Sequence, residues 1–278
     1  MKTVLFLLGI TLTLNTIAQK NESKVVLAKG QKIVVKMTST QNADMGMGME
    51  MKSSSSSQNN IIVVNATDPS NYTLTNTLTG IKLSMDFMGQ STNYDSDKKE
   101  DSASEIGKSM STLNVPDTVT LNKYTTAITS AKKETTVSPE EANPIESMFE
   151  SLGNKDDELV KNAFLLIPKE KKAGDKWSDS TITKDVKSYK EYSLKSIEKG
   201  IATLVLVGKV INNTQTEMQG MQVTVNMTME STTDITVDTK TGIVSKRDTK
   251  ADITGGLEMS GQSLPITGKA TTTIVYEY

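Results

Sequence analysis

Hydrophobic and polar residues alternate regularly along the C-terminal part of the chain. From Met221 to Val237, apolar or small residues occupy the odd positions and polar residues occupy almost all the even ones. A period of two over this length predicts a strand with one buried and one solvated face. Residues 201–278 as a whole predict four long antiparallel strands in a row. Turns are expected at Asn212–Asn213, Asp238–Gly242 and Gly261–Gln262.

The N-terminal half carries the same pattern. Ile33, Val35 and Met37 mark a first strand, and a second is predicted from Met45 through the serine run to Ile61 and Val63. In a third strand the apolar phase slips at Gly80, which predicts a bulge or a turn. Ile201–Val207 is apolar at odd and even positions alike, which predicts a central strand covered on both faces.

Two stretches show helical spacing instead. Asn143 and Pro144 open the first, which ends at Gly153, and the second runs from Leu159 to Ile167 and stops at Pro168. Their apolar stripes require a surface to pack on, and the sheet is the only candidate. We therefore predict a mainly β protein of the α+β class: a long, curved antiparallel sheet, a half-open barrel, with two short helices packed on it.

The first eighteen residues have the features of a secretory signal peptide. Lys2 precedes an apolar run from Val4 to Leu14, and Thr16 and Ala18 are small residues placed for cleavage before Gln19. Residues 19–278 are then expected to form a single mainly antiparallel β domain with a helical insertion near 143–167. Because the chain has no cysteine, the exported protein, periplasmic or secreted, is expected to carry no lipid anchor and no disulfide.

Composition limits the chemistry further. With neither histidine nor cysteine, the chain lacks a Ser-His-Asp or Cys-His catalytic system and a zinc site built on those residues. The densest acidic stretches, Glu140–Glu141 and Asp156–Glu158, fall at predicted helix starts, where they complement the helix dipole. A net charge of -2 argues against a nucleic-acid partner, and no stretch after the signal predicts a transmembrane helix. We therefore expect neither an enzyme nor a cofactor.

The chain is rich in methionine, with 15 residues in all. Met45, Met47, Met49 and Met51 alternate with other residues, so one strand would place all four on one face. Thioethers bind Cu(I), but methionine is also a flexible apolar filler of cores and pockets, and we favour that interpretation. The expected ligand-lining side chains come from these strands and from the two helices: Met45, Met47, Met49, Met51, Met221, Met227, Met229, Ile145, Phe149 and Phe164.

Several short motifs resemble known families. Asp-Ser/Thr-apolar triplets at Ser102, Thr118 and Ser180 look like O-glycosylation acceptors of Bacteroidota. The signal end Ile17-Ala18-Gln19, the segment from Phe164 to Trp177 and the hairpin Val237–Ile243 together resemble an uncharacterised family of secreted Bacteroidota proteins. More remotely, the layout is similar to the LolA, LolB and LppX type of lipoprotein carrier. That resemblance implies a curved sheet holding acyl chains against helices.

Three hypotheses follow. The first is a non-enzymatic envelope protein that binds an apolar ligand, a lipid or an acyl chain, on the concave face of the sheet. The second is a surface or scaffold protein with a dry core and a protein partner. The third is Cu(I) binding by methionine. An outer-membrane barrel, suggested only by the end Tyr276-Glu277-Tyr278, lacks aromatic girdles. Trp177 is expected to be structural, closing the end of a core.

Overall fold

The computed structural model describes residues 23–278 except 47, 111, 131–155, 219–220 and 260–261. In these residues twelve strands form one antiparallel sheet. The strands are β1 (Lys32–Asp44), β2 (Glu50–Asn65), β3 (Asn71–Phe87), β4 (Gln90–Asp95), β5 (Asp117–Asn122), β6 (Ile128–Ser130), β7 (Lys176–Ile182), β8 (Val186–Glu198), β9 (Ile201–Met218), β10 (Met221–Asp238), β11 (Val244–Met259) and β12 (Gln262–Glu277).

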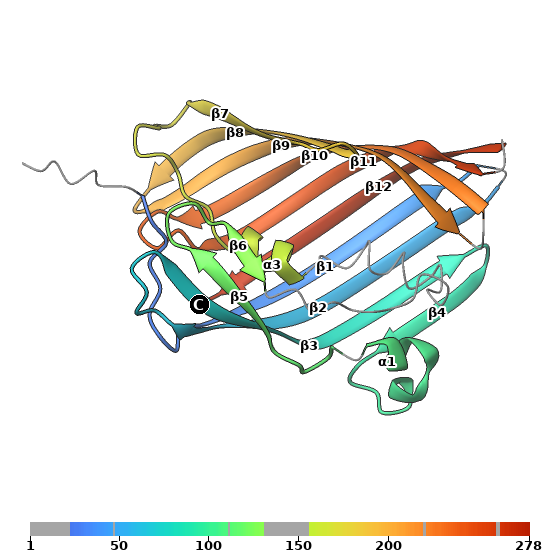
Figure 1. Cartoon of the computed structure of the whole chain (residues 1–278), viewed down its shortest axis with the longest axis horizontal. Coiled ribbons are helices and arrows are strands. Elements are labelled where there is room, and N and C mark those ends of the chain that lie inside the picture. Colours follow the sequence, from blue (N-terminus) through green and yellow to red (C-terminus); the bar gives the residue numbers. More distant parts are fainter. Residues whose placement is uncertain (1–22, 47, 111, 131–155, 219–220, 260–261) are drawn as a thin grey trace, which may run out of the picture.

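The sheet is open and curled. Its order is β6-β5-β3-β2-β1-β12-β11-β10-β9-β8-β7, with β4 beside the far part of β3, and the end strands β6 and β7 do not pair with each other. The first and last long strands meet in the middle, where Val35 of β1 lies opposite Tyr276 of β12. Side chains from β5 near one edge and from β8 near the other join one hydrophobic cluster, so the sheet curls around its inner face (Figure 1). The predicted fold class is confirmed.

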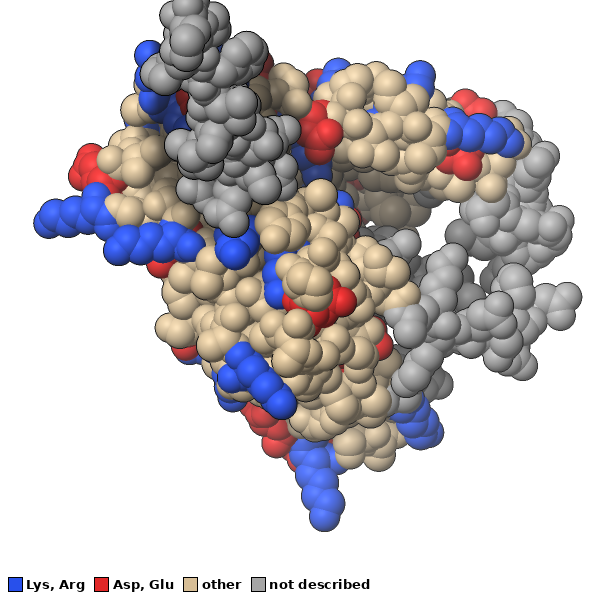
Figure 2. Space-filling view, turned by 60° about the vertical axis from the view of Figure 1, so that its left-hand side comes forward, with Lys and Arg blue, Asp and Glu red and all other residues tan. Residues whose placement is uncertain are grey.

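The predicted alternation places side chains as expected. On β10, Ile235 and Val237 are buried, while the preceding Asp234 is exposed. The outer face carries cross-strand ion pairs such as Lys36–Glu277 and Lys209–Glu230, all well exposed. Such pairs stabilise a fold little, but they mark a solvated surface. Figure 2 shows basic and acidic side chains scattered among one another over the face in view.

The phase slip at Gly80 is a β-bulge. Asn59 pairs with Leu78 and the neighbouring Gln58 pairs with Gly80, so one extra residue of β3 lies between the two pairs. The strand continues on both sides of the bulge, and Leu74 and Met85 both remain on the inner face. The bulge therefore confirms the prediction and explains how one strand holds two apolar phases.

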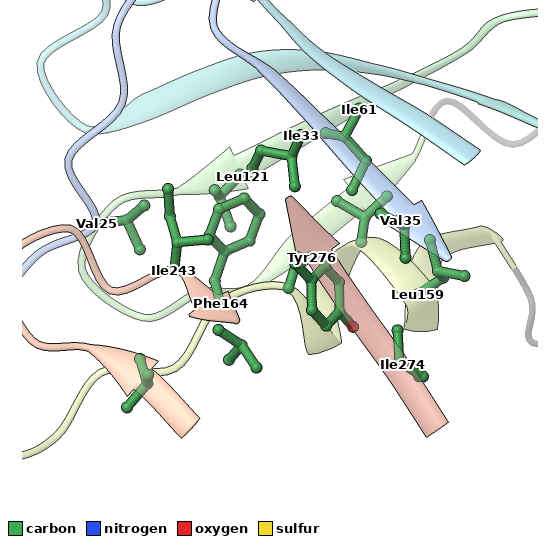
Figure 3. Packing of buried hydrophobic residues seen from close by; sticks show 14 of the residues in the cluster. Val25, Ile33, Val35, Ile61, Leu121, Leu159, Phe164, Ile243, Ile274 and Tyr276 are labelled. Atoms are coloured by element: carbon green, nitrogen blue, oxygen red, sulfur yellow. The ribbon is translucent and has the colours of Figure 1, made fainter. Parts of the chain in front are cut away.

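The core fills one end of the inner face, around α3 (Asp156–Asn162). Leu159 and Val160 of this helix, together with the following Ala163 and Phe164, belong to the same buried cluster as the surrounding strands (Figure 3). The prediction of a helix as far as Ile167 is wrong, because the chain leaves the helix after Asn162 and Phe164 forms a β-bridge with Ile243. The other predicted helix, 143–152, lies outside the described residues.

The predicted strand through Met45–Met49 is also wrong. The described residues of this stretch belong to the turn of the β1–β2 hairpin, with Gly46 and Gly48 at φ angles of 74° and 76°. The Met45 N–H donates to the Met49 carbonyl, which closes the turn. Methionine and glycine alternate here, which gave the stretch a strand-like period. The glycines, however, also permit the positive φ angles that a reversal of the chain requires. From Met51 onwards the predicted inward phase is correct.

Two expectations for β9 are wrong as well. Asn212–Asn213 is not a turn but lies inside this strand, which continues to Met218. The strand is covered on one face only: Leu204 is buried, whereas Ile201 and Val207 are 40% and 50% exposed on the other side. The apolar residues on both faces predicted a second layer that the described residues do not supply.

A short polar excursion joins β4 to β5. It contains a 3-10 turn, η1 (Asp101–Ala103), and α1 (Glu105–Ser109). The Ser104 side chain caps α1 by accepting a hydrogen bond from the Gly107 N–H. The glycosylation motif at Ser102 falls in this excursion and those at Thr118 and Ser180 fall on β5 and β7, all at exposed positions.

Trp177 lies at the edge of the core, where its ring stacks on Tyr192 with the centroids 5.3 Å apart. It is half-buried, so Trp177→Ala is expected to lower the free energy of unfolding by about 1–2 kcal/mol. Urea unfolding followed by circular dichroism measures the change, and Trp177→Phe, which keeps a ring, should recover most of it. A loss below about 0.5 kcal/mol, typical of surface changes, would contradict a structural role.

Candidate ligand-binding face

Beyond the core, the inner face of the sheet turns polar. We call the next band the hydroxyl belt. Ser39 bonds to Thr272 with 3.0 Å between the hydroxyl oxygens, and Thr233 bonds to Thr249 at 2.9 Å, in both cases across neighbouring strands. The strand register places all its members on the same face as the core. The belt consists of Ser39, Ser55, Ser57, Ser231, Thr233, Thr249 and Thr272.

Past the belt the inner face becomes apolar again. We call this region the distal apolar face. Ala43, Met51 and Met85 form a small buried cluster of their own, apart from the main core. Met229 on β10 is 38% exposed, and its neighbours on the same face are half-buried. The region consists of Ala43, Met51, Met85, Val225, Met227, Met229, Ile253, Leu264 and Ile266.

Between these two regions, small residues lie on the inner face of β11 and β12. Ala251 of β11 lies opposite Ala270 of β12, and Ile253 and Gly255 lie opposite Gly268 and Ile266. Ala251 is buried, and Gly268 and Ala270 are half-buried. We call these residues of β11 and β12, which lie next to the methionines of β10, the small-residue strip.

The predicted lining residues are only partly brought together. Met51, Met227 and Met229 share the distal apolar face, and Met221 begins β10. Phe164 is instead packed inside the core. Met45 and Met49 are half-buried in the adjoining hairpin turn. Met47, Ile145 and Phe149 lie outside the described residues.

Sequence reasoning missed Arg247, which lies on the inner face of β11. It is 8% exposed and flanked across the sheet by Ile235 and Ile274. Its Nε donates to the Asn162 carbonyl oxygen at 2.9 Å, at the C-terminal end of α3. Burial lowers the pKa of the guanidinium from its usual value, while nearby tyrosines and Glu158 act in the opposite direction. The guanidinium stays charged, so the core ends on a buried cation.

Tyr276 lies beside this cation. Its side chain is 2% exposed, and its hydroxyl has no hydrogen-bond partner within the described part of the chain. Burial raises the pKa of the hydroxyl well above its usual value, and the charge of Arg247 partly opposes that shift. In Figure 3 the ring lies among the buried side chains of the core, with Val35 and Ile274 nearby.

Two grooves open elsewhere on the surface. One, of about 350 Å³, is lined by apolar residues such as Val26 and Leu166 together with several lysines. The other, of about 690 Å³, lies on β7 to β9 around Tyr189 and Val207. The described residues contain no cluster of three acidic side chains able to hold a metal ion. None of the described helices has the length and hydrophobicity that crossing a membrane requires.

Comparison with known proteins gives a family and little else. The model of a family of unknown function (DUF6263) matches residues 69–244. No curated protein matches the chain.

A lipovitellin structure, described by its lipid–protein interactions, aligns at 9% identity with a TM-score of 0.49. It covers 90% of this chain, which spans about a quarter (25%) of the lipovitellin chain. DynF from the dynemicin biosynthesis pathway of Micromonospora chersina aligns at 9% identity with a TM-score of 0.25, covering 93% and 86% of the two chains. Scores this low carry no argument about function.

Proposed function

This chain belongs to DUF6263, a family of unknown function, and from its own geometry we propose that it binds an apolar ligand on the concave face of its sheet. The observation that carries the proposal is the distal apolar face. Its methionines lie on the inner side of the curl, beyond the hydroxyl belt, and Met229 is 38% exposed. Concave apolar surfaces lined by adaptable side chains are typical of sites for flexible ligands.

The packing around α3 indicates where the ligand does not lie. Leu159, Val160, Ala163 and Phe164 are all buried against the strands, so side chains fill that end of the inner face. Past the belt, the small-residue strip around Ala251 and Ala270 carries no large side chain of its own. We therefore place the ligand over β10 to β12 and not under the helix.

The proposal includes a non-enzymatic role and export to the periplasm or the exterior. The composition supports the first part, because the chain has no histidine and no cysteine. The signal-like stretch 1–18, which lies outside the described residues, supports the second. The resemblance to the lipoprotein-carrier type agrees with both. Scattered surface charge supports the absence of a nucleic-acid partner.

The test uses a neutral apolar dye, N-phenyl-naphthylamine, whose fluorescence rises in apolar surroundings. We expect the purified chain to bind it, and the double variant Met227→Asp/Met229→Asp to weaken binding about tenfold or more. Each lost methionine contact is worth on the order of 1 kcal/mol, and 1.4 kcal/mol corresponds to a factor of ten. Native mass spectrometry with solvent extraction would identify any ligand that is purified with the protein.

The matched control places the same charge on the other side of the same strand. Thr232 is exposed on the outer face of β10, so Thr232→Asp should leave dye binding unchanged. Equal losses in both variants would show that charge on β10, and not the distal apolar face, controls binding. Absence of both dye binding and an extracted lipid would overturn the proposed function.

Docking of a protein partner is the second candidate function, and the outer face of β9 favours it. Ile201 and Val207 are exposed there, and Tyr189 of β8 is 41% exposed on the same side. The open edge strand β7 adjoins this surface, and an open edge can pair with a strand of another chain. A chain that binds no apolar ligand would leave this candidate in first place.

A further inference from the structure

We propose that the ligand is a single-chain amphiphile with a carboxylate head group, and that Arg247 and the Tyr276 hydroxyl bind this head group where the small-residue strip meets the core. The inference rests on the proposed function, because it names the ligand class for the same face. It gives the Arg247 guanidinium a counterion and the Tyr276 hydroxyl a hydrogen-bond partner.

Arg247 is a buried cation for which the described residues provide no ion pair. Burying a charge without a counterion is costly, and arginines at such positions are normally paired. Glu158 acts electrostatically on the guanidinium, but no carboxylate of the described residues lies within ion-pair distance of it. Its hydrogen bond to the Asn162 carbonyl uses one of five N–H donors. A planar carboxylate matches the guanidinium fork with two parallel hydrogen bonds.

The Tyr276 hydroxyl is the second, independent observation. A buried hydroxyl without a partner has lost its hydrogen bonds to water without replacing them. The register places Tyr276 two residues from Ile274, the direct partner of Arg247, and on the same face. A carboxylate bound by Arg247 would accept a hydrogen bond from this hydroxyl, so one anion would satisfy both groups.

The inner face of β11 beside these residues has the polarity order of an amphiphile. Along the inner face of β11, Arg247 is followed by Thr249, Ala251 and Ile253, that is, by a cation, a hydroxyl, a small residue and an apolar residue. Thr249 and Thr272 are half-buried, so the inner face next to Arg247 keeps partial contact with solvent. From Thr249 the inner face of β11 extends over the next eight residues, to Leu257. At roughly 3.3 Å per residue this is a length of about 26 Å, which is enough for a long acyl chain.

The experiment compares three ligands with the same tail, hexadecanoate, hexadecanol and hexadecyl phosphate, by displacement of the neutral dye at neutral pH. We expect hexadecanoate to bind about tenfold or more tightly than hexadecanol. Tyr276→Phe and Arg247→Met should each lower hexadecanoate affinity towards that of hexadecanol, and each should leave hexadecanol binding unchanged.

Arg247→Met also removes the contact with Asn162 and so risks unfolding the end of α3. Tyr276→Phe avoids that problem, because the hydroxyl it removes is not bonded to any described residue. Tyr278→Phe, the same change at a tyrosine that is 49% exposed, is the matched control and should change nothing.

Each other outcome has a defined meaning. Equal binding of hexadecanoate and hexadecanol would overturn the head-group assignment and leave the proposed function standing. Binding of neither, with no dye binding, would overturn the proposed function itself. Tighter binding of hexadecyl phosphate than of hexadecanoate would overturn the carboxylate assignment in favour of a phosphate head group.

Discussion

Phe164→Ala is expected to lower the free energy of unfolding by about 3–5 kcal/mol, the usual cost of removing a buried phenyl ring. Phe164 is 2% exposed and belongs to the main core cluster. It also bridges Ile243, so its ring lies where the chain leaves α3 and meets the start of β11 (Figure 3). The cavity would be surrounded by strands of the sheet, which cannot close over it without shifting the register.

The matched control is Phe87→Ala at the far end of β3. That ring is 36% exposed, so its removal should cost less than about 1 kcal/mol. Urea unfolding followed by the fluorescence of Trp177, the sole tryptophan, measures both variants. Similar losses at the two positions would contradict a core concentrated at the α3 end of the sheet.

Much of the sheet was predictable because a half-buried strand records its buried face at every second residue. Ile33, Val35 and Ile235 were assigned to the interior by this period alone, and all three are buried. The bulge at Gly80 was predictable for the same reason, since a slip of phase is visible in the sequence. These features are local, and the chain carries them regardless of which strands become neighbours.

The errors concern features that the alternation of apolar and polar residues does not encode. Alternation at Met45–Met49 resembled a strand, although glycine at positions 46 and 48 permits the reversal that the chain makes there. Val207 has the hydrophobicity of a covered residue, yet no described element covers it. Whether a face acquires a second layer depends on the whole chain, so a single strand cannot specify it.

The candidate site shows the same division. The methionines of β10 were predicted to line the inner face, and their strand phase is correct. Arg247 was missed because its neighbours Lys246 and Asp248 make the stretch look like a solvated charge run. Its phase with Ala251 and Ile253 was the available signal. The contact with Asn162 joins residues 85 positions apart and could not be deduced from local pattern.

Among the glycines of the described strands, Gly255 of β11 leaves the least room for a side chain. A Cβ atom added at Gly255 would lie 2.1 Å from the Asn226 carbonyl oxygen and 2.8 Å from the Met227 Cα, both on the β10 backbone. At Gly256 the nearest atom would be the Leu264 carbonyl oxygen of β12, at 3.0 Å. The three strands therefore approach closely only because these two positions lack side chains.

Gly255→Ala is accordingly expected to lower the free energy of unfolding by about 3 kcal/mol, because the β10 backbone would have to move to admit the methyl group. The shift would also displace Met227, its register partner, so dye binding at the distal apolar face should weaken in the same variant. Gly80→Ala is the matched control: its nearest neighbour would be the Ser96 hydroxyl at 3.9 Å, so stability should stay within about 0.5 kcal/mol of the parent chain. Equal stability of the two variants in urea unfolding would show that β10 and β11 do not approach as closely as the structure places them.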